Sequence, residues 1–266
     1  MKNLSLSFPR LGLLLRNDLR RFGRPVLLGS ALVFVFLQLA YQVQMQDFAE
    51  TVEHFPERTI IFDFHEVWFG TLLLICGFVF SSFAFFELHR KESGMQYLLL
   101  PASPIEKWLS RYLITSIGFA LYFFLLYGLS SLVCDALGKP IWGVEVLPFE
   151  WFGDDTWMMI AFYLVLQSLF LTGSLFLGRF SFLTTPLFLG ALGLIVFLIS
   201  ISYIKVLIWN ISDGWDLSPD GAYRNSEAWT NTFNHTIFPL VMGLFWWVLA
   251  PFFWVVSYLK LTETER

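Results

Sequence analysis

Long uncharged runs alternate with short charged segments along the whole chain. Six runs of about 20 to 25 residues hold no charged side chain, and none of them alternates apolar with polar positions. They are residues 25–46, 67–86, 112–134, 156–178, 180–204 and 237–259. A helix of about 20 apolar residues crosses a hydrocarbon core of roughly 30 Å, whereas barrel strands need alternating runs of about ten residues. The pattern therefore predicts an all-α integral membrane protein with six transmembrane helices.

The segment before the first run, residues 1–24, is basic and amphipathic. Leucines recur at helical spacing on one face, and arginines form a stripe on another. The arginines expected at the membrane interface are Arg16, Arg20 and Arg24. We predict an interfacial helix that lies along the headgroups, with a basic flank that only fixes the topology as the alternative. Pro25 is expected to end this helix before the six-helix domain of residues 25–266, because proline disrupts a helix interior.

Composition and charge distribution support the membrane assignment and add an orientation. Of the 266 residues, 56% are apolar and only 14% are charged, whereas soluble domains carry about 25% charged residues. With the N-terminus in the cytoplasm, 13 of the 17 Lys and Arg residues fall on the cytoplasmic side, as the positive-inside rule requires. We therefore expect a bacterial inner (plasma) membrane protein with both termini in the cytoplasm.

The runs lack the chemistry of most membrane enzymes and ion-coupled transporters. No ionisable side chain lies deep within them, although ion pathways generally need such groups at membrane depth. The chain also lacks a G-x-x-x-x-G-K-[ST] phosphate-binding loop. Cys76 and Cys134 fall within runs and are expected to pack as apolar side chains. The acidic loop with His54 and His65 shows no compact ligand spacing, so we predict no metal site and no catalytic residue.

One charged segment, residues 87–111, divides into two pieces. Residues 87–92 are predicted to extend the second span into water, and Gly94 to allow a change of direction. A short apolar helix is then expected over residues 95–100, ending at Pro101. Its leucines would face the cytoplasm, and exposed apolar groups of this kind favour binding in a protein groove.

The second piece begins with a helix cap. Ser103 and Glu106 match a capping box, with proline at the first helical position. The Ser103 hydroxyl can accept the backbone N–H of Glu106, and the Glu106 carboxylate can accept that of Ser103. We therefore expect a new helix that starts at Ser103 and enters the third span. The segment would then hold a short helix across the membrane face between two long ones.

This order of elements resembles the cytoplasmic loop of ABC-2 type permeases, the membrane subunits of ATP-binding-cassette transporters. In that family an acidic residue and a glycine precede a leucine-rich turn, a proline, a small residue and a serine, and a basic residue heads the third span. The matching positions here are Glu92, Gly94, Leu98, Leu99, Pro101, Ala102, Ser103 and Arg111. Elsewhere the likeness is one of architecture. The resemblance implies the ABC-2 (type V exporter-like) permease fold.

The resemblance also implies a function and partners. The chain would be a permease subunit that exports its substrate, paired with an identical or paralogous permease and driven by two ATPase subunits that hold ATP and magnesium. The chain itself would be no enzyme and would need no cofactor. Its ATPase-coupling residues would be Lys91, Glu92, Gly94, Met95, Tyr97, Leu98, Leu99, Leu100 and Pro101. The uncharged spans favour an amphipathic, lipid-like or peptide cargo over a small ion.

Two other classes of function stay open at this point. A non-transporting membrane scaffold or sensor subunit would dock a cytoplasmic partner through the same segment. A membrane enzyme would have its site in the acidic loop around His54 and His65. In each case we expect membrane lipid, and no nucleic acid, as a further partner.

Overall fold

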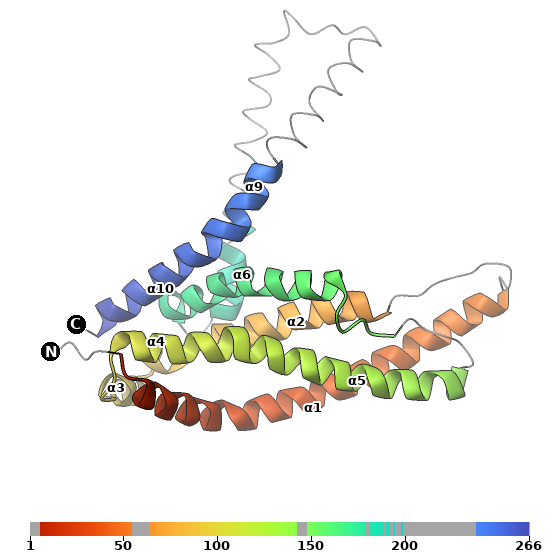
Figure 1. The fold of residues 1–266 in the computed structure, drawn as a ribbon, viewed down its shortest axis with the longest axis horizontal. Helices are drawn as coiled ribbons and strands as arrows, with labels where there is room; N and C mark the ends of the chain where they lie inside the picture. Colours follow the sequence, from red (N-terminus) through yellow and green to blue (C-terminus); the bar gives the residue numbers. More distant parts are fainter. Residues whose placement is uncertain are drawn as a thin grey trace, which may run out of the picture.

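The described part of the protein is built from helices alone. The computed structural model describes residues 6–54, 64–142, 148–178, 181–188 and 238–265, with isolated positions between 190 and 198. Within these residues the chain contains no strand (Figure 1). The elements are α1 (Phe8–His54), α2 (Phe64–Ser82), η1 (Phe86–His89), α3 (Lys91–Leu98), α4 (Pro104–Leu113), η2 (Ile114–Gly118), α5 (Phe119–Trp142), α6 (Asp154–Phe176), α9 (Phe238–Leu244), η5 (Phe245–Leu249) and α10 (Ala250–Thr264).

Five helical stretches are long and apolar enough to cross a membrane, which confirms the predicted helices and is compatible with a membrane protein. They are Phe8–Asp47, Phe64–Ser82, Pro104–Leu137, Asp154–Phe176 and Met242–Thr264. The predicted run at residues 180–204 lies mostly outside the described residues. The count of six spans therefore stays a prediction.

The predicted helix break at Pro25 is wrong. α1 is one helix of 47 residues with Pro25 inside it. Proline removes one backbone hydrogen bond and crowds the preceding turn. Before this point, however, Asp18 of α1 bonds to α4, and after it Ser30 and Gln38 bond to α5. α4, η2 and α5 form one continuous helical column. Packing of α1 on this column before and after Pro25 outweighs the local cost of the proline. A helix of this length spans about 70 Å, more than a bilayer of about 45 Å. The exposed Arg16, Arg20 and Arg24 lie in its first half, and their position at the membrane interface stays a prediction.

The column that faces α1 contains a π-helical turn. η2 joins α4 to α5 without a break, and the Thr115 carbonyl there accepts a hydrogen bond of 2.6 Å from the Tyr163 hydroxyl of α6. Gln167 Nε2 donates to Thr115 Oγ1 at 3.0 Å, and Gln167 Oε1 accepts from Ser116 at 3.0 Å. A π turn disturbs the regular backbone ladder. Here, side chains of α6 provide partners at that point.

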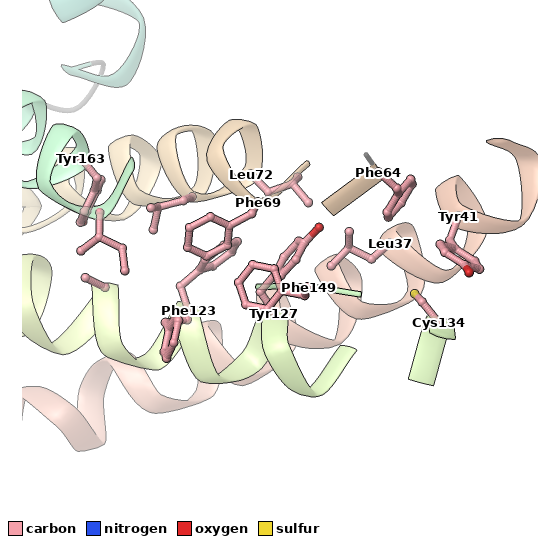
Figure 2. Close-up of a cluster of buried hydrophobic side chains, with 14 of the residues drawn as sticks. Leu37, Tyr41, Phe64, Phe69, Leu72, Phe123, Tyr127, Cys134, Phe149 and Tyr163 are labelled. Carbon is pink, nitrogen blue, oxygen red and sulfur yellow. The ribbon is translucent and has the colours of Figure 1, made fainter. Parts of the chain in front are cut away.

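An aromatic core fills the space between α1, α2 and α5 (Figure 2). The Phe69 ring of α2 lies 5.2 Å from the Tyr127 ring and 6.1 Å from the Phe123 ring, both on α5. Phe149, which precedes α6, lies 5.3 Å from Phe69. Tilted and edge-on aromatic pairs at these distances stabilise packing beyond the area they bury. The core therefore fixes the long helices against each other.

α2 and α6 approach closely at a glycine. A Cβ added at Gly77 would lie 2.2 Å from Cε2 of Tyr163, whose ring is fully buried. Small residues that allow close approach are the usual contact between membrane helices. Gly77 is therefore required for the position of the Tyr163 ring. The Tyr163 hydroxyl, in turn, donates to the Thr115 carbonyl of η2.

The Gly77→Ala substitution is expected to destabilise the folded protein by about 1–3 kcal/mol, because the added methyl group overpacks the contact with Tyr163. Thermal unfolding in detergent micelles measures this. Gly243→Ala in α9 is the matched control, since a Cβ there meets nothing within 4 Å. Equal midpoints for the two variants would contradict the predicted contact.

Candidate functional site

The segment between α2 and α4 contains a short transverse helix, α3 (Lys91–Leu98). α2 ends at Ser82, and η1 follows as a single 3-10 turn. Arg90 is extended, with φ −105° and ψ 130°, and α3 begins at the next residue. Figure 1 shows α3 across the end of the long helices, near the start of α1 and the start of α4.

Residues 87–92 do not form the predicted water-facing extension of the second span. Glu87 is only 7% exposed. Its carboxylate forms ion pairs with Arg111 of α4 and Arg21 of α1. A buried carboxylate needs such partners. Glu92, by contrast, is exposed as expected.

Gly94 lies inside α3, so its predicted role as the point where the chain changes direction is wrong. The change occurs before α3 at Arg90 and after it in residues 99–103. A Cβ added at Gly94 would lie 3.1 Å from the Leu88 carbonyl oxygen and 3.3 Å from that of Glu87. A glycine here allows α3 to pack directly on the backbone of η1.

α3 has an exposed apolar face and a buried aromatic residue. Leu99, at its end, is 82% exposed and Met95 is 65% exposed. Leu98 is also exposed, so the exposure predicted for the three leucines is confirmed for Leu98 and Leu99 and is wrong for Leu100. Tyr97 is buried, and Leu100 is partly buried against the cluster to which Tyr97 belongs. Burial raises the pKa of the Tyr97 hydroxyl, so this side chain is neutral at physiological pH.

The predicted capping box of α4 is present. Glu106 N–H donates to Ser103 Oγ at 3.3 Å, and Ser103 N–H donates to Glu106 Oε2 at 2.8 Å. The same carboxylate also binds the start of α1. Its Oε1 accepts from the Ser7 backbone N–H at 2.7 Å and lies 3.3 Å from Arg10 Nη2. One residue therefore caps α4 and fixes the N-terminal helix beside it.

Loss of the cap is expected to have a moderate effect. Ser103→Ala removes the acceptor of the Glu106 N–H and should cost about 1 kcal/mol of stability. Ser103→Thr keeps a hydroxyl and should remain close to the wild type. The two thermal midpoints, measured in the same detergent, check this. An alanine variant as stable as the threonine variant would show that the cap does not stabilise the fold.

A buried ion-pair cluster lies next to α3. It consists of Arg111 from α4, Asp18 and Arg21 from α1, and Glu87 from η1. Arg111 Nη2 lies 3.2 Å from Asp18 Oδ1 and 3.4 Å from Glu87 Oε1, and the side chain of Arg111 is only 2% exposed. Ser110 Oγ donates to Asp18 Oδ2 at 2.7 Å. Arg21, whose side chain is 50% exposed, pairs with Glu87 at the edge of the cluster, so two cations balance two carboxylates.

The Arg111 guanidinium also contacts aromatic rings. It lies 4.9 Å from the Phe22 ring centroid of α1 and 5.3 Å from the Tyr97 ring centroid of α3. Both distances suit a cation–π interaction. Arg111 therefore contacts four elements: its own α4, α1, η1 and α3.

Lys107 joins α3 to the C-terminal helix. Its Nζ donates to the Leu98 carbonyl at 3.1 Å and to Glu265 Oε1, just after α10, at 3.0 Å. At the next residue, Trp108 Nε1 donates to Ser257 Oγ of α10 at 2.8 Å. A lysine at the end of a helix satisfies a carbonyl that the helix leaves unpaired. Both described ends of the chain thus meet the start of α4.

Most of this cluster is not identified by the sequence reasoning. The family resemblance places Arg111 at the head of the third span, and the charge pattern places Glu87 in a water-facing extension. Neither assigns a partner to Asp18 or Arg21. One signal was present, because Asp18 is the only acidic residue in positions 1–46. A lone carboxylate in a basic segment indicates an ion-pair partner elsewhere.

The predicted outer-loop histidine lies in a helix. His65 is in the first turn of α2 and is 2% exposed. Its Nε2 lies 3.1 Å from Asp135 Oδ1, and its Nδ1 lies 3.3 Å from the Tyr127 hydroxyl. The side chain of His54 is outside the described residues. Among the residues that are described, no three His, Cys, Asp or Glu side chains form a group able to hold a metal ion.

The fold and the site together define a class: a helical membrane-integral protein with a transverse helix fastened by buried ion pairs at one end of the long helices. Comparison of the chain with protein-family models, curated proteins and solved structures gives no match.

Proposed function

We propose that the protein is the permease subunit of an ATP-binding-cassette exporter of the ABC-2 type, with α3 as the element that docks into the ATPase. The observation that carries the proposal is that α3 has an exposed apolar face, formed by Met95, Leu98 and Leu99. The opposite side of α3, here called its base, is attached to the rest of the protein. An exposed apolar face of this kind favours a protein partner.

The base of α3 is attached at three points. Gly94 packs on the η1 backbone, Tyr97 lies under the Arg111 guanidinium, and the Leu98 carbonyl accepts from Lys107. Force applied at Leu99 therefore reaches α4, and through α4 it reaches α1, α5 and α10. Nucleotide-driven closure of the ATPase subunits would move this assembly as a rigid body.

The positions of the chain ends support the proposed orientation. Ser7 and Glu265 both bond to the first turn of α4, so the two described ends lie at the same end of the protein (Figure 1). The positive-inside bias assigns this end to the cytoplasm. In the proposed complex it meets the ATPase.

Purification of the full-length tagged chain from its native membrane in a mild detergent tests the proposal. We expect an ATP-binding-cassette ATPase, identified by its phosphate-binding loop sequence, to co-purify in a one-to-one ratio with the chain. Absence of that subunit under conditions that keep the chain folded would overturn the proposal. An ATPase that binds, yet leaves reconstituted vesicles impermeable to every amphiphile and peptide tried, would indicate the scaffold or sensor function.

A further inference from the structure

A long groove runs between α1, α2 with η1, and α5. Its volume is about 590 Å³, within the usual range of ligand sites of about 300–1,000 Å³. The α1 side extends from Arg21 to Val33, and the α5 side from Phe119 to Leu126. The groove is separate from the apolar face of α3.

The polar groups of the groove are concentrated at one end. Arg21, Glu87 and Arg90 lie there, whereas most of the remaining wall is apolar. Ser30 and Tyr122, further along, form a hydrogen bond of 2.6 Å with each other, so these two neutral hydroxyls are paired. The groove is therefore amphipathic along its length.

The charged end is net positive. Glu87 divides its charge between Arg21 and the buried Arg111. Arg90 is exposed and stacks over the Phe86 ring at 4.7 Å. No described residue forms an ion pair with Arg90, so this guanidinium has donors available to an anion.

The length of the groove matches one leaflet. From Arg21 to Val33, α1 rises by about 18 Å, close to the roughly 15 Å of half a hydrocarbon core. The arginines lie at the α3 end, beyond the apolar run of α1. This places positive charge at headgroup level and apolar wall at acyl-chain level.

We propose that this groove binds an anionic phospholipid, with an acyl chain along α1, α2 and α5 and the phosphate at Arg21 and Arg90. Arginine binds a phosphate with two parallel hydrogen bonds, and basic residues at a membrane surface select anionic lipid. The inference depends only on insertion of the helices in a bilayer, not on the proposed ATPase.

Native mass spectrometry of the full-length protein tests this inference. The protein is exchanged into micelles with equal amounts of phosphatidylglycerol and phosphatidylcholine of the same acyl chains. We expect the wild type to retain phosphatidylglycerol preferentially, and Arg90→Gln to reduce that preference by about fivefold. Equal retention of the two lipids by the wild type would overturn the proposal.

Two glycines of α1 provide a matched pair for the acyl-chain part. A Cβ at Gly29 or at Gly12 meets nothing within 4 Å, but only Gly29 lines the groove. Gly29→Phe should fill the groove and abolish lipid retention, while Gly12→Phe should leave it unchanged. Retention that survives Gly29→Phe would overturn the site. A second outcome would also overturn it: if the Gly29→Phe variant no longer forms a dimer but still retains lipid, the groove is an interface between two copies of the chain.

Discussion

Replacing Arg111 with methionine is expected to destabilise the protein by about 3–5 kcal/mol, the cost of removing one member of a buried ion-pair cluster. The side chains of Asp18 and Glu87 are only 6% and 10% exposed. Glu87 would keep Arg21, but Asp18 would keep only the Ser110 hydroxyl. A buried carboxylate without a cation pays most of its desolvation cost. Thermal unfolding in micelles, followed by tryptophan fluorescence, measures the loss.

Two further variants make this result specific. Arg16→Met removes an exposed arginine from α1 and should change stability by no more than about 0.5 kcal/mol. Asp18→Asn combined with Arg111→Met removes the uncompensated charge and should recover part of the stability. A loss below about 1 kcal/mol for Arg111→Met alone would show that the cluster is not buried as described.

Replacing Leu99 with aspartate is expected to abolish binding of the ATPase without unfolding the permease. Leu99 is 82% exposed, so the fold gains little from it. A central apolar anchor at an interface contributes about 2 kcal/mol or more, which corresponds to roughly thirtyfold in affinity. The amount of ATPase retained on the tagged chain, at an unchanged thermal midpoint, is the measurement.

The matched control separates the new charge from the lost apolar contact. Gln96→Asp puts the same carboxylate on an exposed position of α3 and removes no apolar anchor. We expect it to retain the ATPase within about threefold of wild type. If Leu99→Asp and Gln96→Asp behave alike, the apolar face of α3 is not the docking surface.

The sequence was sufficient for features that depend on residues close together in the chain. The apolar runs predicted the membrane helices, and four residues predicted the cap at Ser103 because both of its bonds close within one turn. The prediction failed at Pro25, where a local rule was overruled by packing of α1 on α4 and α5. Local propensity is a weak guide where tertiary contacts lie on both sides.

The ion-pair cluster could not be predicted for a related reason. Asp18 and Ser110 are 92 positions apart, and Lys107 and Glu265 are 158 apart. Their approach depends on how α1, α4 and α10 pack, and no single segment contains that information. The same holds for His65, which the charge pattern placed in a loop and the packing of α2 on α5 buries.

The meeting of the two described ends, at Ser7 and Glu265, at the start of α4 has a practical consequence. Glu265 lies next to the transverse helix through Lys107, so a partner fused to the C-terminus through a short flexible linker starts beside its proposed docking surface. Such a tether gives an effective concentration in the millimolar range. A weakly associating ATPase would then be held on the permease as a single polypeptide. The fraction of permease with a bound ATPase would no longer depend on the concentration of free ATPase.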